Sequence, residues 1–384
     1  MMKTMRRSLS ILAKTFLFLF LTVVVIYLFL ALAALISGIL QYRRNADEQE
    51  KRLTWLREDY YQSYESGGEQ RFTSFDLSHA DQIRLNEVSF LATHNSYQPC
   101  ASWAYRMLIK SVSMIPGVSV DGRLADFEMD GLTEQLEYGI RSLELDVEAF
   151  EKDGILSFFV THFLLDNRST CQDLGKALEE LKLWSEHNPG HLPLIILIEP
   201  KDIRFPVGKC KTFDVNCALE LDNVIREVMG ERLMTPDEVL GTYDSFSSMR
   251  ENDSWPLLED CLGRVLFVLH PCEVTDAYIG LDRTIRTQVM FPCLRHNGIR
   301  EEYASFILDN NPASAADHFK EDYEKLRLMV RTRADDYPDF SDARYASADQ
   351  CGAQIITTDF PPRDVRRDDH TYSFGGYTVK RRNP

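Results

Sequence analysis

Short apolar runs alternate with amphipathic segments from Glu87 onward. The runs are rich in β-branched residues and end in polar ones, and several are apolar on both faces, as buried parallel strands are. They lie at Val88–Thr93, Ile140–Val147, Ser157–His162, Leu194–Glu199, Arg264–His270, Ser305–Asp309, Leu328–Arg333 and Gln354–Asp359. Helical periodicity marks the segments Thr133–Tyr138, Cys171–His187, Ala218–Met229, Ala315–Leu326 and Ser341–Gln350. This alternation predicts an α/β fold, a (β/α)8 barrel, over residues 87–362.

The second run alternates apolar and acidic residues. Successive side chains of a strand point to opposite faces, so Glu144 and Asp146 share one face and Glu148 extends the same row. Two neighbouring carboxylates repel each other and are costly to bury without a partner, and a hard cation between them would remove that cost. The alternative interpretation of Glu-x-Asp alone is an exposed face of a two-sided strand.

The ends of the other predicted strands favour the cation. Catalytic groups of such barrels lie at the C-terminal ends of the strands. These ends carry Thr93-His94-Asn95-Ser96, Thr161-His162, Glu199-Pro200-Lys201, His270, Asp309-Asn310, Arg331, Arg333 and Asp359. A purely structural barrel has no reason to place two histidines and three carboxylates on four consecutive strand ends. We therefore predict an active site there, while His270 and His296 keep a structural interpretation.

The N-terminal region predicts a membrane anchor. Thr15–Leu40 contains no charged residue and is longer than the about 20 apolar residues that span a bilayer. A cleavable signal peptide is the alternative, with Ala31-Leu32-Ala33 as its cleavage site, but its apolar core would be shorter, about 7–15 residues. We expect an uncleaved transmembrane helix at 15–40 after a basic tail at 1–14. Residues 41–86 would form a juxtamembrane helix and linker, and 363–384 a C-terminal tail.

Charge and cysteine content limit the partners and the compartment. The net charge of −16 argues against nucleic acid and against adsorption to anionic lipid by charge alone. Basic residues flank both ends of the apolar stretch, so they do not set its orientation. The eight cysteines, an even number, fit an oxidising compartment, which predicts a barrel outside the cytoplasm. Cys210 and Cys217 could pair, Cys261 and Cys272 lie too far apart along one strand, and free buried thiols are the alternative.

In chain order, the polar strand ends give His-Asn, Glu-x-Asp, His and Glu. This order resembles the calcium-dependent phosphoinositide-specific phospholipase C family at His94-Asn95, Glu144-Leu145-Asp146, His162 and Glu199. The approach to the second strand, Leu132–Arg141, is also similar to that family. Val330–Asp335 and Thr357–Asp359 resemble its bacterial and fungal single-domain members. The resemblance covers residues 87 to 362.

The resemblance implies a phosphodiesterase that acts on membrane inositol phospholipids. It implies that Ca²⁺ is bound by Asn95, Glu144, Asp146 and Glu199, and that His94 and His162 act on the phosphodiester. An all-oxygen donor set suits Ca²⁺ or Mg²⁺ better than zinc. A metal there would lower the pKa of the attacking inositol 2-hydroxyl, and one histidine would protonate the leaving diacylglycerol oxygen. Glu144 or Asp146 would be the base.

Three features stay open. Lys201 and Arg333 are predicted substrate contacts, and salt bridges at the barrel rim are the alternative. The long insertion Cys100–Asp130 contains many apolar residues and would either enter the bilayer beside the active site or pack over the barrel edge.

Two other functions compete with this one. Glycerophosphodiester phosphodiesterases use a related barrel, but their first strand ends in His-Arg-Gly, whereas this chain has His94-Asn95-Ser96. A catalytically inactive, membrane-bound interaction module would have lost some of the expected ligands, and all are present here.

Overall fold

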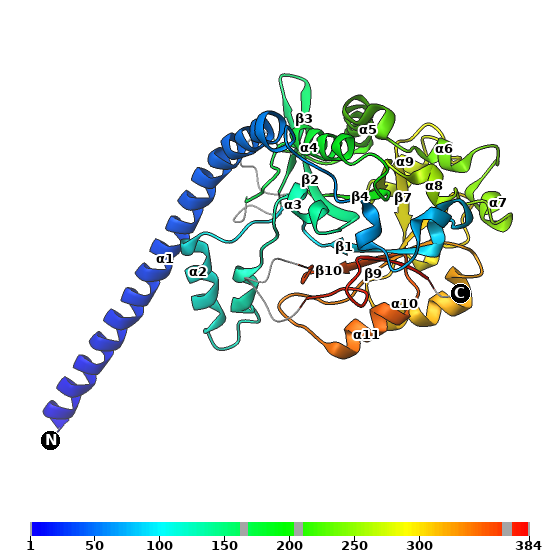
Figure 1. Ribbon diagram of the computed structural model, residues 1–384. Helices are drawn as coiled ribbons and strands as arrows, with labels where there is room; N and C mark the ends of the chain where they lie inside the picture. Colours follow the sequence, from blue (N-terminus) through cyan, green and yellow to red (C-terminus); the bar gives the residue numbers. More distant parts are fainter. Residues whose placement is uncertain (1, 162–167, 203–209, 363–370, 383–384) are drawn as a thin grey trace.

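The computed structural model describes residues 2–161, 168–202, 210–362 and 371–382 (Figure 1). In these parts of the chain, eight parallel strands form a closed barrel, which confirms the predicted fold class. In barrel order the strands are β1 (Val88–Thr93), β2 (Ser142–Lys152), β4 (Leu194–Pro200), β6 (Val265–Leu269), β7 (Met290–Leu294), β8 (Phe306–Leu308), β9 (Met329–Arg333) and β10 (Ile355–Thr358). The barrel closes because β1 pairs with β10 on one side and with β2 at Ala92–Ser142 on the other.

One predicted barrel strand was wrong, and one barrel strand was not predicted. The segment predicted as a third barrel strand is β3 (Ile155–Val160), which runs antiparallel to an extension of β2 beyond the barrel. Asp153 and Gly154 both have positive φ and form the tight turn between them. The barrel strand that was not predicted is β7, whose Pro292 is unusual inside a sheet. The predicted number of strands was right because these two errors cancel.

The inward-facing side chains change from apolar to polar along each strand near the site. On β1 the inward row runs from Phe90 through Ala92 to His94, and on β9 it runs from Met329 through Arg331 to Arg333. The apolar members pack in one buried cluster inside the barrel. The outward-facing Leu143, Leu145 and Val147 of β2 belong to a second cluster, beneath the surrounding helices. Polar groups therefore gather at the C-terminal mouth.

The helices around the barrel follow the predicted periodicity. The helices in the predicted segments are α3 (Leu132–Glu137), α4 (Leu174–His187), α5 (Val215–Met229), α10 (Pro312–His318) and α11 (Asp342–Gln350). Short helices are α6 (Pro236–Leu240), α7 (Phe246–Glu251), α8 (Leu258–Cys261) and α9 (Thr275–Ile279). Asp173 caps α4 by accepting from the Lys176 amide. The predicted helix at 315–326 differs, because α10 ends at His318 and a π-helical turn follows at Phe319–Tyr323.

The outer segments attach to the barrel. Inside the predicted C-terminal tail, β11 (Val379–Arg381) pairs antiparallel with β1. The short β5 (Cys210–Lys211) pairs with the extension of β2. In the predicted linker, Glu69 accepts from the fully buried Arg141, with 2.6 Å between Nη2 and Oε1. The linker is therefore fastened to the N-terminal side of the barrel.

The N-terminal helix α1 (Met2–Trp55) has two different halves. Its second half lies on the barrel, where Gln49 exchanges two hydrogen bonds with the backbone of Asp173 and Arg52 forms a 2.6 Å ion pair with Glu180. Its first half projects away from the domain (Figure 1), and large apolar side chains such as Phe16 and Phe29 are mostly exposed. Within the described residues, α1 is the one helix long and apolar enough to cross a membrane.

The described cysteines are free thiols. They are Cys100, Cys171, Cys217, Cys261, Cys272, Cys293 and Cys351. The Cys217 thiol is buried and donates to the Thr212 carbonyl oxygen, so it does not form the disulfide considered for Cys210 and Cys217. These thiols remove the support that the cysteine count gave to an oxidising compartment.

Candidate active site

Three carboxylates from neighbouring strands meet at the barrel mouth. Glu144 and Asp146 lie on the inward face of β2, and Glu199 lies opposite Asp146 in the β2–β4 register. One oxygen from each lies within 4.8 Å of the others, and Glu144 and Asp146 are only 3% and 0% exposed. The period of a strand therefore places both residues of Glu-x-Asp in the site, and β4 contributes the third acid.

Asp146 is the least satisfied of the three acids. Among the described residues, neither of its carboxylate oxygens has a hydrogen-bond partner. The Lys201 ammonium lies 3.2 Å from its Oδ2 and 2.6 Å from Glu199 Oε1, which gives an ion pair but leaves Asp146 without a well-aligned donor. Burial, and then the charges of Glu199 and Glu144, raise the pKa of Asp146 against the opposing effect of Lys201.

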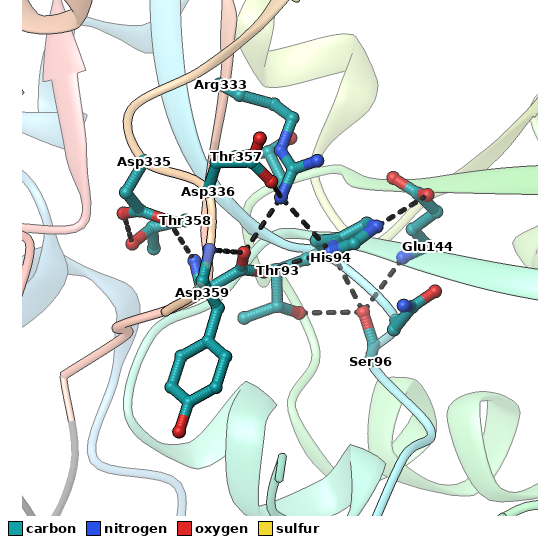
Figure 2. Close-up of polar contacts among 12 residues, drawn as sticks. Thr93, His94, Ser96, Glu144, Arg333, Asp335, Asp336, Thr357, Thr358 and Asp359 are labelled. Atoms are coloured by element: carbon teal, nitrogen blue, oxygen red, sulfur yellow. Dashed lines mark hydrogen bonds and ion pairs between the residues drawn. The ribbon is translucent and has the colours of Figure 1, made fainter. Parts of the chain in front are cut away.

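Glu144 is held as a carboxylate. Its Oε2 accepts from Arg331 Nη2 at 2.5 Å, across the barrel interior, and Oε1 lies 3.9 Å from His94 Nε2. Burial favours the neutral form, but Arg331 and His94 outweigh it and lower the pKa of Glu144. The backbone is fixed as well, because the Glu144 amide donates to Ser96 Oγ at 2.9 Å (Figure 2).

His94 pairs with a carboxylate on the neighbouring strand. Its Nδ1 lies 3.0 Å from Asp359 Oδ1, and Asp359 Oδ2 accepts from Arg333 Nη2 and from the Tyr337 amide, each at 2.8 Å (Figure 2). Burial raises the pKa of Asp359, but His94 and Arg333 outweigh burial and lower it. Asp359 is therefore ionised and accepts hydrogen bonds. The Nδ1 of His94 then carries the proton and donates, and Nε2 faces Glu144. Burial lowers the pKa of His94, but the charges of Asp359 and Glu144 outweigh burial, so the pKa is raised.

A second layer of hydrogen bonds positions this pair. Asp335 accepts from the Asp359 amide at 2.7 Å and from the Thr358 hydroxyl, so the backbone after β10 is held from behind (Figure 2). Asn95 has a φ of 47°, in the left-handed region that asparagine tolerates better than most residues. The chain therefore turns sharply after His94, and both side chains reach the mouth.

A cavity of about 380 Å³ opens beside His94. Its polar wall comes from the barrel and includes His94, Asn95, Arg333 and Asp359. Its apolar wall comes from the insertion at 100–130, which contains α2 (Trp103–Ser113) and the 3-10 helix η5 (Gly122–Asp126). The apolar lining residues are Tyr105, Ile109, Val120, Leu124, Ala125 and Phe127. One face of the insertion therefore packs over the barrel edge, and entry of its other face into the bilayer stays a prediction.

The structure brings together most of the predicted site residues. His162 lies outside the described residues, but the preceding Thr161 amide donates to the Asp146 carbonyl oxygen at 3.1 Å. Lys201 and Arg333 form salt bridges with site carboxylates, the second alternative considered for them. His296 contacts Tyr323 and stacks on His318.

Sequence reasoning did not assign roles to Arg331 and Asp359. Both residues lie at predicted strand ends, and this position was the one sequence signal for a role in the site. Their partners Glu144 and His94 are distant in the chain, so the sequence did not reveal the pairings. His270 keeps its structural interpretation as a prediction. Burial lowers the pKa of His270, and the nearby acids Glu199 and Glu144 oppose that effect.

The family profile described as "Phosphoinositide phospholipase C, Ca2+-dependent" matches residues 148–384. The chain belongs to this family. Members are calcium-dependent phosphodiesterases, and the cluster of Glu144, Asp146 and Glu199 can hold a metal ion. Because the matched range begins at Glu148, the roles of residues on β1 and at the start of β2 rest on their geometry.

Solved structures show the same fold. A calcium-dependent phosphoinositol-specific phospholipase C from Pseudomonas sp. is 19% identical with a TM-score of 0.54, and the alignment covers 82% of this chain and 99% of that one. The enzyme from Streptomyces antibioticus is 17% identical with a TM-score of 0.50, covering 72% and 95%. No curated protein matches the chain significantly.

Proposed function

We propose that this phospholipase C family member cleaves phosphatidylinositol-type lipids to diacylglycerol and a cyclic inositol phosphate. The observation that carries the proposal is the arrangement at the mouth. The carboxylate cluster and the His94–Asp359 pair lie on adjacent strands, and a cavity with one polar and one apolar wall opens beside them. A phospholipid is divided in the same way, into a charged headgroup that suits the polar wall and acyl chains that suit the apolar wall.

The donor set fits the calcium ion of the family. Asp146 offers two buried oxygens that have no hydrogen-bond partner in the described parts of the chain, which is costly unless a cation binds there. Glu144, Asp146, Glu199 and Asn95 would hold the ion. When bound, Ca²⁺ lowers the pKa of the inositol 2-hydroxyl and neutralises charge on the phosphate.

The protein's own groups would then divide the proton transfers. Asp359 keeps the proton of His94 on Nδ1, so Nε2 is the atom that can act on the phosphate or on the leaving diacylglycerol oxygen. The base for the 2-hydroxyl would be Glu144, which Arg331 keeps ionised, or Asp146, whose raised pKa makes it the more basic of the two. His162 remains the predicted second histidine. Lys201 and Arg333 would contact the inositol phosphate after exchanging a carboxylate partner for it.

Intramolecular attack by the 2-hydroxyl is favoured by its high effective molarity. The full-length protein should therefore be assayed in detergent against phosphatidylinositol, phosphatidylcholine and a glycerophosphodiester, with calcium or with chelator. We expect calcium-dependent cleavage of the inositol lipid and a transient cyclic ester in phosphorus NMR. Cleavage of a 2-deoxy inositol lipid, or an acyclic phosphate with no cyclic precursor, would contradict the proposal and favour direct attack by water.

We further propose that α1 is an uncleaved anchor and that the barrel lies outside the cytoplasm. The support for the anchor is the exposed apolar half of α1, which has a mean hydropathy of 3.0 over its most apolar window. The sidedness stays a prediction from the even number of cysteines, and the free thiols do not add to it. Protease added to intact cells should remove the barrel and leave a short membrane-bound stub. A barrel that is protected until the cells are lysed would contradict the sidedness, and an N-terminus at Leu32 or later in the mature protein would contradict the anchor.

A further inference from the structure

The insertion after β1 touches the apolar half of α1, away from the barrel. Figure 1 shows α2 beside the middle of α1. Tyr27 Oη donates to the Ser111 carbonyl oxygen at 2.9 Å, and Ala34, only 2% exposed, is buried in a cluster with Ala101 and Ala104. Both α1 residues lie inside the apolar stretch at 15–40. The contact therefore joins the proposed membrane span to the wall of the cavity.

The length of the span determines where α2 must lie. Thr15–Ile26, the part before the contact with α2, covers only about 18 Å at about 1.5 Å per residue, less than the about 30 Å of a hydrocarbon core. A helix that crosses the bilayer in this stretch must include the segment Tyr27–Ala34. Because α2 is packed on that segment, α2 enters the bilayer with it.

The outer surface of the insertion suits lipid. Its exposed large apolar side chains outside the cavity lining are Trp103, Met107, Met114, Ile115 and Val118, with Trp103 63% and Met114 76% exposed. An exposed apolar surface of this kind indicates a binding face, and tryptophan is common at membrane interfaces.

The basic residues of the insertion have acidic partners within it. Lys110 lies 2.6 Å from Asp126, and Arg123 lies 2.7 Å from Asp121. Pairing lowers the cost of bringing these charges close to hydrocarbon.

We propose that α2 and the loop through Leu124 form a second membrane-embedded element, docked on α1, through which a lipid enters the cavity directly from its leaflet. The inner face of the same element lines the cavity that leads to His94. The bilayer is thus the binding partner of the outer face, and acyl chains would pass between Ile109 and Leu124 while the headgroup reaches the barrel. The identity of that lipid rests on the proposed phospholipase activity, whereas the embedding rests on the proposed membrane span of α1.

Quenching of Trp103 fluorescence tests the embedding. Full-length protein is reconstituted in phosphatidylcholine vesicles with or without brominated acyl chains, beside Trp103→Phe as the matched variant. Trp184 and Trp255 are buried, and Trp55, which is 45% exposed, is present in both proteins, so a quenched component that disappears in Trp103→Phe reports α2. Equal quenching in the two proteins overturns the proposal. Release of the protein from vesicles by carbonate also overturns it, because α1 then does not span.

A second experiment tests the docking on α1. Ala34→Leu should push α2 away from α1, whereas Ala31→Leu adds the same side chain at an exposed position of the same helix. We expect Ala34→Leu to lower cleavage of vesicle-bound inositol lipid about fivefold or more, with unchanged cleavage of a water-soluble short-chain lipid, and Ala31→Leu to change neither. Equal activity of the two variants on vesicles contradicts lipid entry through the docked element. Trp103 quenching without cleavage of any substrate would instead contradict the proposed function and leave the embedding intact.

Discussion

Two sets of buried carboxylates lie at the barrel mouth, and they differ in the partners that surround them and in the direction of their pKa shifts. Glu144 and Asp359 each have a guanidinium partner and lie close to His94, and these charges lower their pKa values in spite of burial. Asp146 and Glu148 are equally buried, but burial and then neighbouring acids raise their pKa values, that of Glu148 to about 8. We call Glu144 and Asp359 the complete set, because each has a guanidinium partner. We call Asp146 and Glu148 the incomplete set, because each has at least one buried oxygen without a hydrogen-bond partner among the described residues.

The difference separates positioning from binding. A buried ion pair whose partners are also hydrogen-bonded keeps a defined geometry, which a histidine needs to present one nitrogen to a substrate. Buried acids without such partners destabilise the fold until a cation arrives. The complete set, Glu144 and Asp359, therefore orients His94, and the incomplete set on β2, together with Glu199 of β4, is suited to capture Ca²⁺.

Removing calcium should give the largest effect. Excess chelator should abolish cleavage of phosphatidylinositol, because the incomplete set then lacks its cation. Calcium should restore activity, and magnesium should do so poorly, since magnesium requires near-octahedral order and retains its waters. The measurement is product release against free metal concentration. Full activity in chelator would show that the acids need no cation, and that a basic group such as Lys201 serves instead.

Replacing His94, the histidine that the complete set positions, should give the second-largest effect. His94→Gln should lower kcat by about 10²–10⁴-fold, the usual contribution of positioned proton transfer, with little change in calcium affinity or Tm. His296→Gln is the matched control, because His296 contacts His318 and Tyr323 outside the cavity lining. Equal losses in the two variants would argue that the effect is structural.

Asp359→Asn should have a smaller effect that identifies its role. An amide can donate to Nδ1 and favours the wrong tautomer of His94, so we expect kcat to fall by about 10–10²-fold. The pKa of His94 should also fall, because the nearby anion that raises it is lost. Proton NMR of the imidazole and the pH profile of kcat measure this. Asp336→Asn, which removes the exposed second partner of Arg333, should leave both unchanged.

Asp146→Asn should change stability in the opposite direction to most buried substitutions. Because the folded-state pKa of Asp146 is raised, the folded protein binds this proton more tightly than the unfolded chain, and without metal the stability falls as pH rises from about 4 toward the raised value. In chelator at pH 8, the variant should melt a few degrees higher than the parent, and its calcium requirement should rise about tenfold. A lower Tm in chelator at every pH would show that Asp146 is already satisfied.

Lys201→Met should give the smallest change, and it tests how the lysine affects cation binding by the incomplete set. The Lys201 ammonium lies among the acids that would bind calcium, so its removal should increase calcium affinity a few-fold, as measured by isothermal titration calorimetry. Lys176→Met, which removes an ion pair on α4 with Glu50, is the control. Weaker calcium binding in Lys201→Met would mean that the ammonium supports the site rather than competing for it.

Local periodicity was enough to predict much of this protein. The period of two in β2 places Glu144 and Asp146 on one face wherever the strand lies, and the alternation of strands and helices indicates a parallel barrel. The apolar run at 15–40 likewise predicts a long exposed helix from composition alone. These features depend on neighbours in the chain, which a sequence displays directly.

Pairings between distant segments were decided only by the tertiary structure. The strand at Ile155–Val160 has the composition of a barrel strand, but a two-residue turn returns it to β2, and β7 enters the barrel in spite of Pro292. Arg331 reaches Glu144 across the barrel, and Asp359 reaches His94 from the last strand of the barrel to the first. The docking of Ala34 on α2 is of the same kind. Each depends on which surfaces closure of the barrel and packing bring together, and no local pattern encodes that.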